Sequence, residues 1–83
     1  MNRRHRRTLE AIFAHPPGAV RWRDVEFMLK GLGGVVSERA GSRVAILLNG
    51  RVAVFHRPHP GPEMSRGAVR DLRRFLENAG VTP

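Results

Sequence analysis

The chain has 83 residues, which leaves room for one small domain with a single hydrophobic core. Apolar residues make up 41% and charged residues 27% of the sequence, a composition typical of a folded globular domain and not of a disordered chain. The absence of cysteine excludes disulfides and thiolate metal sites, and it fits the reducing cytoplasm, where we expect the protein to reside. No apolar run approaches the roughly 18 residues that cross a bilayer, and no signal peptide opens the chain, so we expect neither membrane insertion nor secretion.

The charge balance is the most informative part of the composition. Fifteen Lys and Arg residues against seven Asp and Glu give a net charge of +8, and Lys30 is the only lysine. Such an excess points to a polyanionic partner, either a nucleic acid or an acidic protein. A basic surface without a binding role is the alternative, because an arginine bias also follows from GC-rich coding.

The first third of the chain predicts two helices. Residues 1–7 hold four arginines and one histidine, and we expect this basic arm to be loose at its start. Apolar residues at helical spacing predict a short helix over 8–14, ended by the prolines that follow. A second helix is predicted from about Trp22 to Leu32, with acidic residues at its start and two glycines at its end.

The middle of the chain predicts three strands. A short strand is expected over 35–39, followed by strands over 43–48 and 51–56. Asn49-Gly50 between the last two is the strongest local signal, because a type I′ hairpin turn needs two residues that tolerate positive φ. Trp22 and Phe55 are expected in the core rather than at a base-stacking surface.

A last helix is predicted after an extended, proline-rich loop. Ser65 is a good N-cap, and Gly80 suits the end of a helix that runs to Ala79. Its arginines lie mostly opposite its apolar stripe. The predicted order is therefore α-α-β-β-β-α, an α+β fold with a three-stranded antiparallel sheet.

The two-residue turn also predicts the register of the hairpin. Arg43 falls directly opposite His56, and Ser42 falls opposite Arg57. Since side chains alternate along a strand, Arg43 and His56 share one face with Ala45, Leu47, Val52 and Val54. Both faces are mostly apolar, so we expect helices to cover one and a partner to cover the other.

The Arg43–His56 pair is the candidate for chemistry. Directly opposed residues have Cβ atoms about 4.5–5.5 Å apart, close enough for both side chains to act on one phosphate. His56 can serve as general base near pH 7, whereas Arg43 keeps its proton and can stabilise a pentacoordinate phosphate. A pair at the sheet edge without a role is the alternative. His59 is either a third member of this site or a loop residue, and His5 and His15 are expected to be solvated.

Three segments carry a family resemblance. They are 35–43 with Gly41-Ser42 before the second strand, 54–59 at the end of the hairpin, and 67–80, which ends in Ala-Gly. In order and spacing they resemble the HicA toxins of bacterial type II toxin–antitoxin systems. The resemblance covers about residues 22–81 of a single 1–83 domain and leaves 1–21, the basic arm and first helix, as an extension.

The resemblance implies a fold similar to a double-stranded-RNA-binding domain, with the helices on one face of the sheet. It also implies translation-independent cleavage of mRNA, neutralised by a HicB antitoxin. The family motif is Gly-Ser-His with a catalytic histidine, but here Arg43 follows Gly41 and Ser42. His56 matches a second histidine that recurs in the family. This departure leaves three alternatives. In the first, His56 takes over proton transfer. In the others, the chain binds RNA without cutting it, or it belongs to a subfamily with another target or mechanism.

The resulting hypothesis is an mRNA-cleaving toxin held inactive by a HicB-like antitoxin. His56 is predicted as acid and base, Arg43 as the group that stabilises the phosphorane, and Ser42 as the residue that orients the turn. No metal or other cofactor is expected. Predicted phosphate contacts are Lys30, Arg57, Arg66 and Arg70. The main alternative is a non-catalytic RNA-binding or partner-binding module, and DNA binding is weaker because no helix-turn-helix spacing is present.

Overall fold

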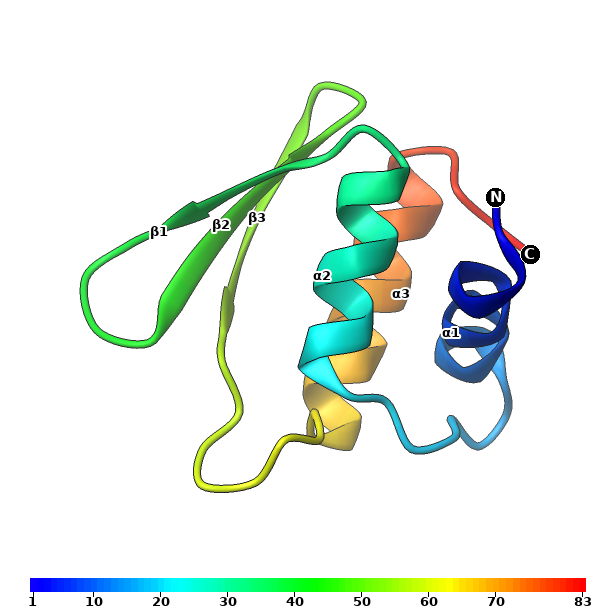
Figure 1. Cartoon of the computed structure of the whole chain (residues 1–83), viewed down its shortest axis with the longest axis horizontal. Coiled ribbons are helices and arrows are strands. Elements are labelled where there is room, and N and C mark those ends of the chain that lie inside the picture. The colour runs from blue at the N-terminus through cyan, green and yellow to red at the C-terminus, as the bar shows by residue number, and fades with distance from the viewer.

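A computed structural model describes residues 1–83, and its elements follow the predicted order. Three antiparallel strands form a sheet, α2 and α3 cover one of its faces, and α1 packs on these two helices away from the sheet (Figure 1). The predicted α+β fold, with helices on one face of the sheet, is confirmed. The elements are α1 (Arg3–Phe13), α2 (Trp22–Gly31), β1 (Val35–Glu38), β2 (Arg43–Leu48), β3 (Arg51–His56) and α3 (Arg66–Asn78).

The hairpin has the register that its turn predicts. The strand order is β1-β2-β3, and the pairing of β2 with β3 runs from Leu48↔Arg51 to Arg43↔His56. Asn49 and Gly50 both have positive φ, at 49° and 79°, which is the conformation of the two central residues of a type I′ turn. The side-chain amide of Asn49 also donates a 2.8 Å hydrogen bond to the Ala79 carbonyl, which fastens the hairpin tip to the end of α3.

The core lies between the sheet and the helices α2 and α3. The large apolar residues of β2 and β3 that point toward the helices are buried, as are the apolar stripes of both helices. The strand residues are Val44, Ile46, Leu48 and Phe55. Phe55 lies between two other aromatic rings, with centroid distances of 6.1 Å to Trp22 and 6.1 Å to Phe75. No polar or charged residue is buried, so the core is purely apolar.

The basic arm is more ordered than the sequence predicts. From Arg3 onward it is the first turn of α1, and the Asn2 side chain caps this turn by accepting a 2.8 Å hydrogen bond from the His5 backbone N–H. Arg4 contacts Asp24 on α2 at 3.3 Å. These contacts order residues that composition alone marks as a loose arm.

The far end of α1 is held by α3. Arg73 donates hydrogen bonds to the carbonyls of Ile12, at 3.2 Å, and Ala14, at 3.3 Å. Arg73 therefore satisfies two carbonyls that the end of the helix leaves without intrahelical partners. Arg73 is thus a packing contact between α3 and α1, on a helix whose arginines the sequence places mostly opposite the apolar stripe.

Other differences from the predicted elements are small. β1 ends at Glu38, one residue early, and α2 ends at Gly31 with Leu32 as its C-cap. Ser65 caps α3 as predicted, because its hydroxyl accepts a 3.1 Å hydrogen bond from the Ala68 backbone N–H. None of the helices combines the length and the apolar character needed to span a membrane.

Candidate functional site

The candidate residues meet at the end of the sheet opposite the hairpin turn. Arg43 and His56 are direct cross-strand partners, and both are exposed on the face without helices. One step further, the Arg57 backbone N–H donates a 2.9 Å hydrogen bond to the Ser42 carbonyl, which extends the β2–β3 ladder beyond the strands. The structure thus brings Ser42, Arg43, His56 and Arg57 together through the backbone.

Ser42 lies beside the His56 ring. Its hydroxyl oxygen is 3.4 Å from His56 Nδ1, at the long end of hydrogen-bond distances. Gly41 before it has a φ of 70°, so the tight β1–β2 turn uses a conformation that favours glycine. This geometry places the serine where it can orient the imidazole through Nδ1 and leave Nε2 free.

The Arg43 guanidinium is only partly occupied by the protein. Its Nε donates a 3.3 Å hydrogen bond to the Ala40 carbonyl in the β1–β2 loop. No carboxylate lies within ion-pair distance of Arg43. The two terminal amino groups therefore remain available to an anion, which is the geometry that recognises two oxygens of a phosphate.

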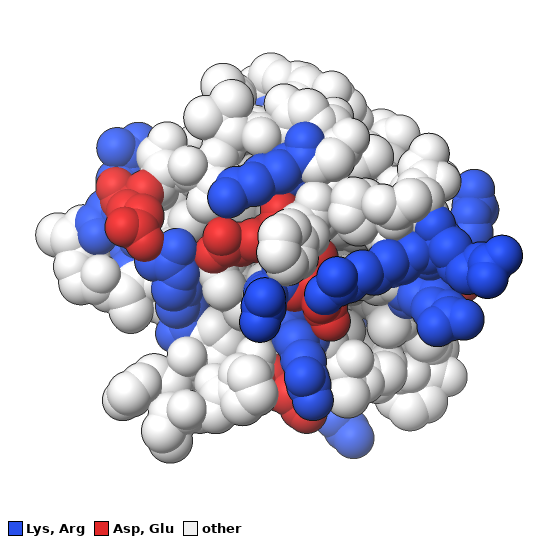
Figure 2. Space-filling model, viewed as in Figure 1, with Lys and Arg blue, Asp and Glu red and all other residues white.

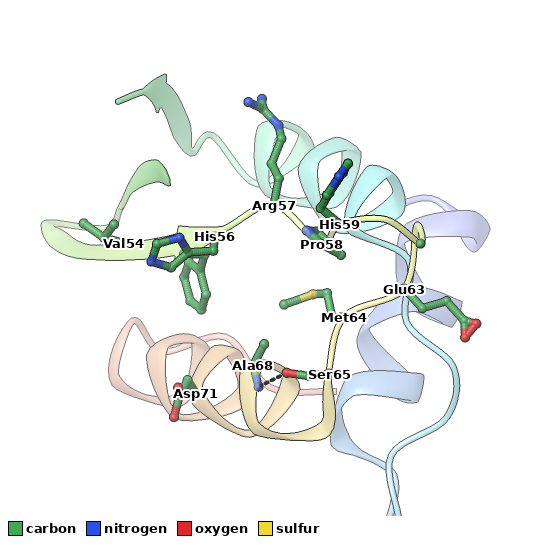
Figure 3. Close-up of a pocket in the computed structure, with 12 residues that line it drawn as sticks. Val54, His56, Arg57, Pro58, His59, Glu63, Met64, Ser65, Ala68 and Asp71 are labelled. Atoms are coloured by element: carbon green, nitrogen blue, oxygen red, sulfur yellow. Dashed lines mark hydrogen bonds between the residues drawn. The ribbon is translucent and has the colours of Figure 1, made fainter. Parts of the chain in front are cut away.

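An open cavity of about 490 Å³ adjoins this end of the sheet. The end of β3, the following proline-rich loop and the first turns of α3 form its walls (Figure 3). His56 and His59 both line it, together with Ser65 and Asp71. His59 lines this cavity as an exposed residue of the loop after β3 and makes no hydrogen bond to His56 or Arg43, so both interpretations of His59 remain open.

Asp71 is a residue of this cavity that the sequence prediction does not single out. It lies three residues after Ala68 and four before Phe75, so it borders the apolar stripe of α3 on the side facing β3. A helical wheel of α3 shows that Asp71 borders the apolar stripe. Only the packing of α3 against the sheet shows that this flank faces the His56 cavity. No group of three or more His, Asp or Glu side chains is arranged to hold a metal ion.

Arg57 is engaged by two carboxylates. Its guanidinium donates to Glu26 of α2, at 3.1 Å, and to Glu38 of β1. Hydrogen bonding to Glu38 raises the pKa of the Arg57 guanidinium above its usual value, burial opposes this, and Glu26 adds to it. Arg57 points away from His56 in Figure 3, toward the helical layer.

The other predicted phosphate contacts are spread over the helices. Lys30 lies 4.0 Å from Glu26, the carboxylate that also binds Arg57. Arg66 borders a hollow lined by residues of the α1–α2 linker, and Arg70 follows it by one turn on the same side of α3. Arg66 and Arg70 therefore lie on a flank of α3 different from that of Asp71, away from the His56 cavity.

Charge and apolar surface are distributed unevenly. Figure 2 shows cationic side chains spread over the side of the molecule that faces the viewer. They are densest toward α1, and acidic side chains lie among them. The sheet face without helices instead exposes Val35 (55%), Leu47 (45%), Val52 (67%) and Val54 (53%). These four residues, here called the open-face patch, are continuous along the sheet with Arg43 and His56.

The sequence matches one family model, described as HicA toxin of bacterial toxin–antitoxin, over residues 22–81. The chain belongs to the HicA family. The match begins at the first residue of α2 and extends just past α3, so α1 lies outside the matched part of this HicA chain. No curated protein and no solved structure matches the sequence. Membership confirms the resemblance and makes the protein a toxin of a toxin–antitoxin pair.

Proposed function

We propose that this HicA protein is an endoribonuclease that cleaves mRNA in the cytoplasm and is inactivated by a HicB-type antitoxin. The observation that carries this proposal is the pairing of Arg43 with His56 on an exposed sheet face, beside an open cavity. A general base and a cation with free donors then flank the position of a single phosphate. The net charge of +8 supports a polyanionic substrate.

In the proposed reaction the RNA supplies its own nucleophile. His56 removes the proton from a 2′-hydroxyl, and the 2′-oxygen attacks the adjacent phosphorus while the P–O5′ bond breaks. His56 then returns the proton to O5′, which leaves a 2′,3′-cyclic phosphate and a 5′-hydroxyl. Arg43 stabilises the additional negative charge of the pentacoordinate phosphate, and Ser42 orients the His56 ring. No metal or cofactor takes part in this scheme.

Cations away from the pair would bind the rest of the RNA. Arg66 and Arg70 are exposed on α3 and have no carboxylate within ion-pair distance. They can therefore contact phosphates of a strand that extends past the cavity. Lys30 shares Glu26 with Arg57, so its contact with a phosphate would compete with that carboxylate.

The antitoxin is proposed to bind the open-face patch. Four exposed apolar side chains on one sheet face form a surface that favours protein rather than phosphate. Arg43 lies on the same face, so a partner with an apolar centre and an acidic rim would fit. Bound there, it would cover Arg43 and His56 and prevent RNA from reaching them.

Single-turnover cleavage of an RNA by the purified, antitoxin-free chain tests this proposal. The matched substrate carries a single 2′-deoxy nucleotide at the cleaved position. We expect the all-ribose RNA to be cut and the substituted RNA to remain intact, with activity retained in EDTA. Cleavage of the 2′-deoxy substrate, or loss of activity in EDTA, would refute the 2′-hydroxyl mechanism.

The substitution at residue 43 favours one second candidate, a non-catalytic RNA-binding or partner-binding module. The resemblance places a catalytic histidine at this position, and here Arg43 turns part of its side chain back to the Ala40 carbonyl. RNA binding without any cleavage would support this candidate. The salt dependence of binding would then have a log–log slope of about −0.7 for each neutralised phosphate of a single strand.

A further inference from the structure

Arg57 joins four elements of the fold. It follows β3 directly, and its side chain reaches Glu26 on α2 and Glu38 at the end of β1. Its backbone N–H meanwhile donates to Ser42, just before β2. One residue therefore ties α2 and all three strands together at the end of the sheet that carries Arg43 and His56.

Glu26 makes this attachment firm. Its side chain is 20% exposed and accepts a hydrogen bond from the Trp22 indole N–H in addition to that from Arg57. Trp22 is buried and packs against Phe55, which neighbours His56 in β3. The Glu26 carboxylate is thereby held by the aromatic core, and Arg57 transmits that fixed position to the end of β3.

The same contacts leave little attraction for an RNA phosphate. Two carboxylates flank a single guanidinium, and Lys30 is the only other cation within ion-pair distance of Glu26, so the charges of this cluster balance. To bind a phosphate, Arg57 would have to give up charge-assisted hydrogen bonds, the stronger class of hydrogen bond in proteins. Arg43, by contrast, has no carboxylate partner to give up.

We infer that Arg57 is a positioning residue, which holds Ser42 and His56 in register for proton transfer and does not contact RNA. The inference rests on the proposed function and replaces the phosphate contact that the sequence predicts for Arg57. Its distinguishing property is dependence on Glu38 and Glu26. If Arg57 contacts a phosphate, removal of a competing carboxylate should tighten RNA binding. If Arg57 is a positioning residue, the same change should slow cleavage.

Three variants separate the two roles. Arg57→Gln removes the charge, Arg57→Lys keeps a charge that cannot span both carboxylates, and Glu38→Gln weakens one anchor at a side chain that is 72% exposed. Arg51→Gln is the matched control, because Arg51 is an exposed arginine of β3, the strand that Arg57 follows, and it has no ion-pair partner. Thermal unfolding of each variant verifies that it is folded.

We expect all three variants to lower the single-turnover rate at saturating RNA by about ten- to a hundredfold, because misplacement near 1 Å has effects of this size. The Kd for RNA and its salt slope should stay unchanged, as should every property of Arg51→Gln. The imidazole resonances of His56 in NMR spectra should shift or broaden in the three variants. Arg57 would instead be a phosphate contact if Arg57→Gln reduced the salt slope by about 0.7 and Glu38→Gln tightened RNA binding.

The NMR measurement keeps the inference separate from the proposed function. If the native chain cleaves no RNA, the proposed function fails, but the His56 resonances still report whether Arg57 fixes the imidazole. Unchanged resonances in Arg57→Gln and Glu38→Gln would overturn the inference even if cleavage is observed. Altered resonances without cleavage would support the positioning and reject the enzymatic role alone.

Discussion

Arg43 and His56 are direct partners across the β2–β3 ladder, and both side chains lie on the sheet face that no helix covers. The family motif implies a histidine at position 43, so this chain pairs a guanidinium with the remaining imidazole. The exposed location leaves both groups accessible to a substrate as large as RNA. Each residue can also be substituted without disturbing the core.

Replacement of His56 tests proton transfer. His56→Ala should lower the cleavage rate by about 10²- to 10⁴-fold, the usual contribution of a general acid and base. Because His56 is exposed, the melting temperature should change little. His59→Ala is the matched control on the same cavity. Equal losses of cleavage rate in the two variants would contradict a special role of His56.

Replacement of Arg43 tests whether this arginine takes part in catalysis or impairs the site of the family. If Arg43 stabilises the phosphorane, Arg43→Ala should lower the rate constant by about 10²- to 10³-fold, as loss of one preorganised donor does. We expect Arg43→His to be slower than the native chain as well. A faster Arg43→His variant would instead indicate a family site that arginine impairs, and would remove Arg43 from the mechanism.

The open-face patch makes a prediction about the antitoxin. Leu47→Asp places a charge at the centre of this patch, and we expect it to weaken antitoxin binding by about tenfold or more, as for a central interface residue. Phe27→Asp is the control, since Phe27 is 43% exposed but lies on α2. Titration calorimetry of both variants with a HicB-type antitoxin measures the effect. Equal weakening by both would place the interface elsewhere.

The register of β2 predicts that substitutions at two neighbouring residues change the free energy of unfolding by very different amounts. Ile46 has no exposed surface and faces the helices, so Ile46→Ala should lower the free energy of unfolding by about 2–5 kcal/mol. Leu47→Ala, on the open face, should change it by less than about 0.5 kcal/mol. Urea unfolding of the two variants provides the measurement. Similar losses at both positions would mean that the two faces are exchanged or equally covered.

Loss of Arg73 should release the end of α1. Arg73→Ala removes the hydrogen bonds to Ile12 and Ala14, which hold α1 to α3. We expect faster hydrogen exchange in α1 and an unchanged pattern in β2 and β3. Arg74→Ala is the control on the exposed side of α3. Uniformly faster exchange over the whole chain would contradict a local role.

Local sequence determined most of the sheet and the candidate pair. Asn49-Gly50 specifies a two-residue turn, this turn sets the register, and the alternation of a strand then places Arg43 beside His56. The N-cap of α3 at Ser65 and the left-handed Gly80 just after its C-cap follow from equally local rules. Such features are predictable because the interacting groups are close in the chain.

The tertiary structure alone decided how this site is supported. Glu26 engages Arg57 only because α2 packs against the sheet, and Glu38 only because β1 pairs with β2. Asp71 reaches the His56 cavity only through the docking of α3. The basic arm becomes helix for the same reason, since Asp24 and the rest of α2 lie beside it. These side chains are 15 or more residues from their partners, and no periodicity of the sequence specifies which long-range pairs form when the layers pack.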